Sequence, residues 1–339
     1  MSKSNIIEQI VSVSPENKKS QISGFFDEIS GKYRSLIDSI LTEIENGIIQ
    51  NETTQDKLSK ATKSIVEKGH SLAISIENSK LVNLIKENFR GLVGPWMLKS
   101  LIMKRALEKP RGYPGDYQML EYIYDNKPIS EGIGYYFDRG FLESDLVQSV
   151  INRKNLTKEE LKALVKSGGN PKILNLASGS CREIREMLSE GVKDKFSLTC
   201  LDQDEEAIAF SQNALKGLAD VTFVKDDIFN ITKDERKPLL NDNDLIYSIG
   251  LIDYLPDRVL KKIIKSIYDN LKPGAVLLLS HKDHGVYTPM REDWLSDWKF
   301  VPRDEKKMLS LLNDVGINIE KIDVFREPTK IIFFMRIRK

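Results

Sequence analysis

The sequence has 339 residues, more than one compact domain needs, and its 51 Lys and Arg residues balance 50 Asp and Glu residues. Balanced charge gives no field that would attract nucleic acid or an anionic membrane surface, so neither partner is expected. Two cysteines without CxxC spacing, the lack of an export signal and the lack of any stretch near 18 apolar residues argue for a cytoplasmic protein without a membrane span.

Helical periodicity dominates the first part of the chain. From about Ser23 to Leu107, apolar residues recur at helical spacing with charged residues between them. Breaks are predicted at 46–56 (NGIIQNETTQD) and at 91–96 (GLVGPW), where glycine, proline or polar residues interrupt the pattern. We therefore predict an all-helical N-terminal domain over residues 1–145 that covers the substrate.

The stretch 109–125, KPRGYPGDYQMLEYIYD, places two prolines and two glycines around aromatic residues. Prolines restrict the backbone and glycines free it, which favours a rigid, irregular loop suited to recognition. The alternative is an ordinary helix start in which Asp116 caps the helix that follows. The candidate substrate-binding side chains of this region are Arg111, Tyr113, Asp116, Tyr117 and, farther along the chain, Tyr136.

Beyond Ser167, short apolar and β-branched runs alternate with helical segments. The predicted strands are KILNLA, FSLTCLD, VTFVKDD, DLIYSIG, AVLLLSH and KIIFFMRI. This alternation predicts an α/β domain over residues 146–339, with a Rossmann-like, mostly parallel sheet and flanking helices. No helix lies behind the last run, which permits antiparallel pairing with its neighbour.

A tight turn follows the first predicted strand, in LNLASGSCREI at 174–184. Small residues between that strand and a helix from about Arg182 expose backbone N–H groups that a nucleotide-like cofactor can approach. Only Gly179 is a glycine, so the GxGxxG fingerprint is absent, and the loop taken alone is equally compatible with a simple connection. Its candidate cofactor-binding residues are Asn175, Ala177, Ser178 and Gly179.

The next strands also end in polar or small residues. A carboxylate after the second strand can accept hydrogen bonds from both ribose hydroxyls, and one after the third can accept from an adenine amino group. Each acid taken singly is more often a helix cap or turn residue, but parallel strands end at one edge, and together they favour a site. These candidates are Asp202, Gln203, Asp226, Asp227, Ile228, Ser248, Ile249 and Gly250.

Over about residues 168–339 the sequence resembles the class I S-adenosylmethionine-dependent methyltransferases. LNLASGSCREI resembles the family's first motif, and SIGLIDYLPD resembles its segment after the fourth strand. The resemblance assigns the ribose-binding acid to Asp202 and the adenine-binding acid to Asp227. It implies S-adenosylmethionine as cofactor and S-adenosylhomocysteine as product. Ala177 and Cys181 stand where the family often has glycines.

A narrower resemblance spans both halves of the chain. It lies in RGYPGDYQMLEYIY, LDQDEEAIAFS, IDYLPDRV and DWLSDWKFVPRDEKKM. These segments are similar to bacterial extracellular-factor or 3-hydroxypalmitic acid methyl ester biosynthesis proteins. The resemblance implies methyl transfer to a small-molecule acceptor, the carboxylate of a small or acyl acid. Two alternatives stay open: methylation of an amine or phenol, and a non-catalytic sensor or scaffold that binds S-adenosylmethionine.

The acceptor side is less defined than the cofactor side. A carboxylate acceptor is ionised at neutral pH and needs no general base, whereas an amine or phenol calls for one. His281 in SHKDHG is a candidate for orienting the acceptor or accepting its proton, and a structural role is equally open. His284 is three residues away, but no third ligand is evident, so no metal is predicted.

The candidate catalytic side chains are Tyr113, Tyr254 and His281, and Tyr254 and His281 are also candidates for binding substrate. Trp294 and Trp298 stand four residues apart, which predicts a packing stripe on a helix. The oligomeric state is left open by the sequence.

Overall fold

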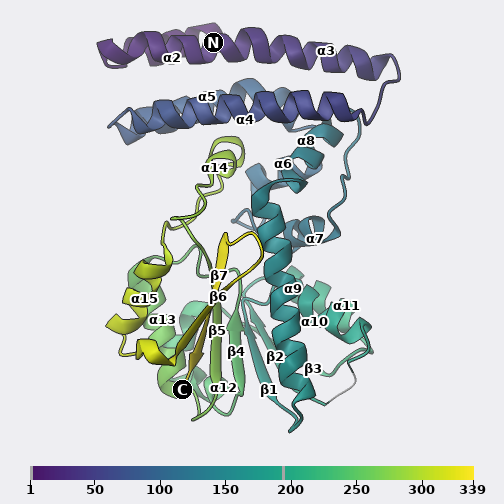
Figure 1. The fold of residues 1–339 in the computed structure, drawn as a ribbon, viewed down its shortest axis with the longest axis vertical. Coiled ribbons are helices and arrows are strands. Elements are labelled where there is room, and N and C mark those ends of the chain that lie inside the picture. Colours follow the sequence, from purple (N-terminus) through teal and green to yellow (C-terminus); the bar gives the residue numbers. More distant parts are fainter. Residues whose placement is uncertain (1–2, 193–194) are drawn as a thin grey trace. The chain divides into compact units, whose positions relative to one another are not determined.

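The computed structural model describes residues 3–192 and 195–339, which divide into two compact units (Figure 1). The helical unit comprises the described residues up to Gly115, together with Asn126–Ser144 and Pro289–Lys299. The sheet unit comprises Asp116–Asp125, Asp145–Thr288 and Phe300–Lys339. Each unit therefore contains segments from distant parts of the chain.

Amphipathic helices build the helical unit, because each buries one apolar face, such as Ile37 and Ile40 of α3. None of the helices in the described ranges is both long and apolar enough to cross a membrane. The helices of this unit are α1 (Lys3–Ser12), α2 (Glu16–Glu28), the π-helical turn η1 (Ile29–Tyr33), α3 (Arg34–Glu45), α4 (Glu52–Ile74), α5 (Ser79–Met97), α6 (Leu101–Glu108), α8 (Ile133–Leu142) and α14 (Met290–Ser296).

The break predicted at 91–96 is wrong, because α5 continues through this segment and carries Pro95 in its last turn. A proline inside a helix costs about 3 kcal/mol. Phe89, Val93 and Met97 stand four residues apart on one face of α5 and are buried. Burying such side chains stabilises the fold by about 1.5–3 kcal/mol each, which outweighs the local penalty.

Trp294 of α14 is fully buried in the helical unit, as the predicted packing role requires. Its ring lies edge-on against Phe25 and Phe89, with centroid distances of 5.7 Å and 5.3 Å. The predicted helical stripe is wrong for Trp298, since α14 ends at Ser296 and Asp297 adopts a left-handed conformation with φ of 50°. Trp298 is nevertheless buried, at 4% exposure.

Gly69 of α4 faces this tryptophan, and a Cβ atom there would lie 2.7 Å from two carbons of the Trp294 ring. We expect Gly69→Ala to destabilise the protein by about 1–3 kcal/mol, because a rigid buried ring cannot move aside. Gly24→Ala in α2 is the matched control, since nothing lies within 4 Å of its Cβ position. The control should be neutral or slightly stabilising. Melting curves of both variants test this, and equal melting temperatures would contradict it.

The sheet unit contains a seven-stranded sheet in the order β3-β2-β1-β4-β5-β7-β6. Strands β1 to β5 are parallel, and β7 pairs antiparallel with β5 and β6. The predicted Rossmann-like fold and antiparallel last strand are confirmed, but β6 was not predicted. The strands are β1 (Lys172–Leu176), β2 (Ser197–Asp202), β3 (Val221–Lys225), β4 (Leu245–Ser248), β5 (Val276–Lys282), β6 (Ile322–Arg326) and β7 (Ile332–Arg338).

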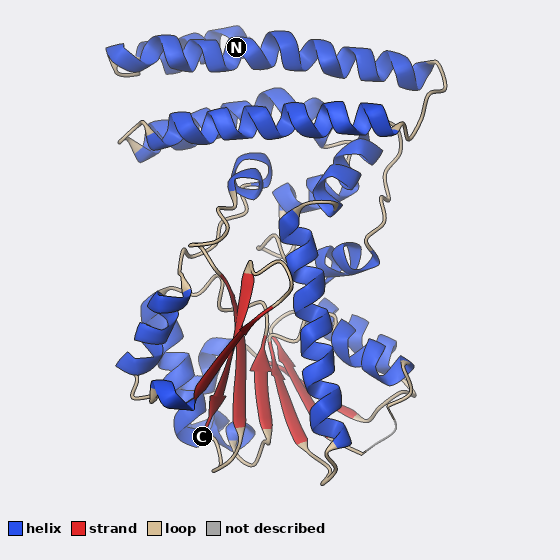
Figure 2. Ribbon diagram, viewed as in Figure 1, coloured by secondary structure: helices blue, strands red, loops and turns tan. Residues whose placement is uncertain are grey.

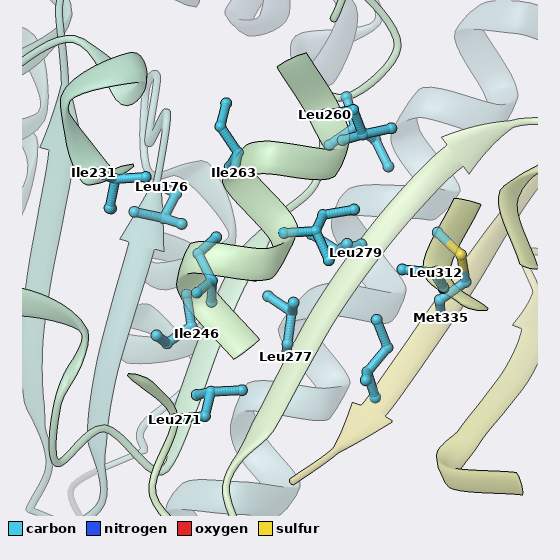
Figure 3. Close-up of a cluster of buried hydrophobic side chains, with 14 of the residues drawn as sticks. Leu176, Ile231, Ile246, Leu260, Ile263, Leu271, Leu277, Leu279, Leu312 and Met335 are labelled. Atoms are coloured by element: carbon cyan, nitrogen blue, oxygen red, sulfur yellow. The ribbon is translucent and has the colours of Figure 1, made fainter. Parts of the chain in front are cut away.

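Helices flank this sheet (Figure 2). They are α7 (Tyr117–Asp125), α9 (Asp145–Lys166), α10 (Arg182–Ser189), α11 (Glu205–Leu215), α12 (Lys237–Leu240), α13 (Asp257–Asn270) and α15 (Glu305–Asp314), with the short 3-10 turns η2 (Ile228–Thr232), η3 (Asp234–Arg236) and η4 (Ile319–Lys321). α13 buries Leu260, Ile263 and Ile267, at helical spacing, in a core shared with β4 and β5 (Figure 3).

Candidate functional site

The loop after β1 holds an unusual concentration of left-handed backbone. Ala177, Gly179 and Cys181 have φ values of 54°, 53° and 49°. For residues other than glycine such conformations cost roughly 1–3 kcal/mol each, and they cluster where a site requires them. The turn closes when the N–H of Cys181 donates to the carbonyl of Ser178 at 3.1 Å, and α10 begins at the next residue. The loop therefore brings backbone N–H groups to the carboxyl edge of the sheet, as predicted.

Asp202, at the end of β2, holds this loop from the neighbouring strand. The N–H of Gly179 donates to Oδ2 at 2.8 Å, and the N–H of Asp204 donates to Oδ1 at 2.9 Å. Asp202 is 5% exposed, and burial raises the pKa of its carboxyl. The structure thus places a buried carboxylate beside the strained loop. Its neighbour Gln203 is exposed.

The two acids after β3 differ in their partners. Asp226 accepts from Asn230 Nδ2 at 2.5 Å and pairs with Arg236 Nε at 2.5 Å. Although burial opposes ionisation, these contacts hold the pKa of Asp226 below its usual value. Asp227 uses one oxygen to cap η2, where the N–H of Phe229 donates to Oδ1 at 2.9 Å. The carboxylate of Asp226 is therefore held by structural contacts. Asp227 is partly buried and makes fewer contacts of this kind. Ile228, the next residue, is buried.

The segment after β4 reaches the same edge. Ser280 of β5 donates to the carbonyl of Ile249 at 2.9 Å, which fixes the backbone between Ser248 and Gly250. Ser248 Oγ and Ser178 Oγ are both buried and have no hydrogen-bond partner among residues 3–192 and 195–339. Buried hydroxyls without partners are uncommon and call for an explanation. Polar groups of a bound ligand would satisfy them.

A buried network lies beneath the loop. Tyr247 donates to Glu183 Oε1 at 2.7 Å, and Asn175 Nδ2 donates to the same oxygen at 3.2 Å. Burial raises the pKa of Glu183, against the effect of the Tyr247 hydrogen bond. Asn175, a predicted cofactor residue, therefore supports the loop from below. Arg182 donates from Nε to Glu186 at 2.8 Å and from Nη1 to Glu121 of α7 at 2.9 Å.

Four buried side chains that can carry charge gather where β4 and β5 end, and we call them the charge cluster: Arg153, Asp253, His281 and Lys282. Asp253 Oδ1 lies 2.9 Å from His281 Nδ1 and accepts from the N–H of Lys282 at 2.9 Å. Asp253 Oδ2 lies 3.4 Å from Lys282 Nζ and 3.7 Å from Arg153 Nη1. Burial alone would raise the pKa of Asp253, but the charge of Lys282 and the contact with His281 hold it well below its usual range.

Of this cluster, sequence reasoning identified only His281. A signal for Arg153 was present, because it stands at helical spacing with Val150, Thr157 and Leu161 on the buried face of α9. A charged residue on an apolar helix face is rarely buried without a reason. Tyr254 lies nearby in sequence and packs against Phe300, with ring centroids 5.7 Å apart.

The predicted recognition loop is divided between the two units. Arg111 and Tyr113 belong to the helical unit, whereas Asp116 and Tyr117 belong to the sheet unit. Asp116 caps α7, since the N–H of Met119 donates to its Oδ1 at 2.9 Å, so the alternative of an ordinary helix start holds for this residue. The ring of Tyr117 packs against Phe210 of α11 at 5.3 Å.

Tyr136 is buried in the helical unit, and its hydroxyl accepts from the N–H of Asn51 at 3.1 Å.

The described part of the chain holds no group of three or more His, Cys, Asp or Glu side chains suited to a metal ion.

Part of the chain is similar to known proteins in sequence or in fold. Residues 173–274 match the family described as a methyltransferase domain, and no curated protein sequence matches the chain. A possible exported protein from Bordetella parapertussis has a TM-score of 0.54 and 16% identity, covering 83% of this chain and 96% of that chain. Magnesium protoporphyrin IX methyltransferase from Synechocystis PCC 6803 with bound SAH has a TM-score of 0.42 and 15% identity, covering 58% and 88%. The first likeness shows a shared fold.

Proposed function

We propose that the chain is an S-adenosylmethionine-dependent methyltransferase whose domain includes the matched residues 173–274, and that its acceptor is the carboxylate of a small or acyl acid. The cofactor site is inferred from the strained loop 177–181, which Asp202 holds by a hydrogen bond from the N–H of Gly179. The hydroxyls of Ser178 and Ser248 are buried at the same edge without partners among the described residues. These groups fit a ligand that brings polar atoms into the edge of the sheet.

We assign the parts of the site as follows. The loop 177–181 and the segment 248–250 would hold the methionine part of the donor, and Asp202, with Gln203 beside it, would accept from the ribose hydroxyls. Asp227 would accept from the adenine amino group while the N–H of Ile228 meets the ring. Asp226 is the weaker candidate for that role, because Arg236 and Asn230 already hold its carboxylate.

Methyl transfer to a carboxylate requires the protein mainly to position the two reactants. S-adenosylmethionine, when bound, supplies a methyl group activated by a sulfonium. The side chains must orient the acceptor oxygen in line with that methyl group and exclude water. A carboxylate has a pKa near 4, so it is already ionised at neutral pH and no proton has to be removed.

The acyl acid is supported by the resemblance of four segments to the 3-hydroxypalmitic acid methyl ester biosynthesis family. Two of the four, in 111–124 and 293–308, lie partly in the helical unit, outside the matched methyltransferase domain. We propose that the acceptor-binding side chains are those singled out in the sequence, namely Arg111, Tyr113, Asp116, Tyr117, Tyr136 and Tyr254.

We propose a cytoplasmic location. The cysteines Cys181 and Cys200 are free thiols whose sulfur atoms lie 3.6 Å apart. Thiols this close stay reduced most readily in a reducing compartment.

A second candidate function rests on the contact between His281 and Asp253. With Nδ1 of His281 2.9 Å from a carboxylate, Nε2 is the nitrogen that is left to accept a proton. Both ring nitrogens are buried and have no hydrogen-bond partner within the described residues, so the carboxylate orients Nδ1 by proximity alone. This arrangement is typical of an oriented base, which an amine or phenol acceptor would need.

The nature of the product separates the two candidates. The protein is incubated with a cell extract and methyl-labelled S-adenosylmethionine, and the labelled product is then treated with mild alkali. A methyl ester releases its label as volatile methanol, whereas an N-methyl group or an aryl methyl ether retains it. Volatile label supports the proposed carboxylate acceptor. Retained label supports the second candidate, and binding of the donor without any labelled product supports a sensor.

Replacing His281 tests its role directly. For a carboxylate acceptor, we expect His281→Asn to change kcat by less than about threefold, because no proton is transferred. For an amine or phenol, removal of the base should lower kcat by roughly 10²–10⁴-fold and remove the acidic limb of the pH profile. His70→Asn in α4 of the helical unit is the control, and circular dichroism verifies that both variants are folded. A large loss of kcat on an ester-forming acceptor would contradict the expectation that a carboxylate is methylated without a base.

A further inference from the structure

Arg153 is a buried cation with an incomplete set of partners. The residue is 5% exposed, and its Nε has no hydrogen-bond partner among the residues that the structure describes. The nearest carboxylate oxygen, Asp253 Oδ2, lies 3.7 Å from Nη1, too far for a hydrogen bond. Asp253 directs its Oδ1 to His281 and to the N–H of Lys282. The guanidinium therefore has a charged neighbour but no carboxylate that binds it directly.

Other buried basic side chains in the sheet unit are bound more closely. Arg303, at 2% exposure, donates from Nε to Asp257 at 2.8 Å, from Nη1 to the carbonyl of Ile252 at 3.0 Å, and from Nη2 to the carbonyl of Leu255. Lys154, next to Arg153 in α9, bonds to Glu186 at 2.5 Å. Burying a charge without direct partners carries a large desolvation cost, so Arg153 is the exception that needs an explanation.

The remaining groups around Arg153 do not complete its set of partners. Tyr124 of α7 offers a hydroxyl without charge. The charge of Arg153 also acts on the buried carboxyl of Glu183. That carboxyl already accepts hydrogen bonds from Tyr247 and Asn175. Arginine has five N–H donors in a fixed fork that matches a carboxylate. Arg153 therefore has unused capacity for this kind of ligand.

The position of Arg153 shows where such a ligand would lie. Its Nη2 is 3.5 Å from the place that a Cβ atom would take at Gly250, so the absence of a side chain there leaves the guanidinium against the backbone after β4. That backbone is part of the proposed cofactor site, at the edge where parallel sheets bind ligands.

We propose that Arg153 binds a carboxylate group of a bound reactant beside Gly250. This assignment rests on the proposed function, which brings two carboxylates to the site: that of the methionine part of the donor, and that of the acid acceptor. Either one would supply the negative charge that the buried guanidinium lacks.

Calorimetry with two donors distinguishes the two sources. S-adenosylmethionine and its decarboxylated analogue differ only in the carboxylate. If Arg153 binds the donor, the protein should bind S-adenosylmethionine about 30-fold or more tightly than the analogue, and Arg153→Gln should bring that ratio near 1. Lys166→Gln, at the exposed end of the same helix, removes the same charge and should leave the ratio unchanged.

A second titration tests whether Arg153 binds the acceptor carboxylate instead. In that case the unaltered protein binds both donors equally, and its complex with S-adenosylhomocysteine should bind octanoate more tightly than octanamide. Arg153→Gln should remove that preference. If neither preference responds to Arg153→Gln, the proposal is wrong. Failure of the unaltered protein to bind S-adenosylmethionine at all would instead overturn the proposed function itself.

Stability without ligand provides an independent readout. If Arg153 binds a ligand, its buried charge lacks its partner in the free protein and destabilises the fold. Arg153→Met should therefore melt at the same temperature as the unaltered protein or a few degrees above it. Arg303→Met should melt well below it, because it removes an arginine with direct partners. A loss for Arg153→Met as large as that for Arg303→Met would assign Arg153 a structural role and contradict the proposal.

Discussion

Asp202→Ala is expected to weaken S-adenosylmethionine binding by at least about 100-fold. A buried carboxylate that accepts from two ribose hydroxyls makes two hydrogen bonds to a charged acceptor, each contributing about 1.5–3 kcal/mol. Removing Asp202 also frees the N–H of Gly179, which donates to its Oδ2 at 2.8 Å, so the loop would lose its connection to β2. Isothermal calorimetry measures the affinity, and circular dichroism shows whether the sheet is retained.

Asp204→Ser is the matched control for this experiment. Asp204 is also buried and lies two residues away, but its carboxylate caps α11 by accepting from the N–H of Glu206 at 3.0 Å. Serine is able to keep this cap, so the variant removes a carboxylate from the same turn without removing a predicted ribose contact. We expect its affinity to stay within about threefold of the unaltered protein. Unchanged binding by Asp202→Ala would remove the basis for the ribose assignment.

Asp253→Ala is expected to produce the largest loss of stability. Asp253 is 2% exposed and is the carboxylate around which Arg153, His281 and Lys282 gather. Breaking a buried ion pair by removing one partner costs about 3–5 kcal/mol, because the remaining charges stay buried. This corresponds to a fall in melting temperature on the order of 10 °C. Asp323→Ala, in a partly exposed pair with Arg336 on β6 and β7, should cost less, about 1 kcal/mol.

Two further measurements test the cause of that loss. Lys282→Met combined with Asp253→Ala should recover much of the stability, because it removes one of the uncompensated cations. The effect should also depend on pH. A carboxyl whose folded pKa is depressed contributes stability above its unfolded pKa of about 3.9 and loses it as the pH falls. The difference between the unaltered protein and Asp253→Ala should therefore be constant at neutral pH and shrink below about pH 4. A pH-independent difference would point to packing instead.

Local patterns were sufficient to predict the strands that form the parallel part of the sheet. Short apolar runs such as 172–177 and 197–202 can be buried on both faces only in such a sheet, and the residues that follow them meet at one edge. Asp202 and the loop at Gly179 are in contact for that reason. The helix through Pro95 was missed because burial of its apolar face outweighed the local signal. The strand β6 was missed because its residues are only partly buried and it depends on antiparallel pairing with β7.

The sequence by itself determined the alternation of strands and helices, the turn after β1 and the acids at the strand ends, since each depends on neighbours along the chain. Only the tertiary structure decided that 289–299 belongs to the helical unit, where Trp294 packs against Phe25 and Phe89. Only the tertiary structure assembled the charge cluster, whose members come from α9, the segment after β4, and β5. Their charges interact through space across about a hundred residues of chain, and no local spacing encodes such a contact.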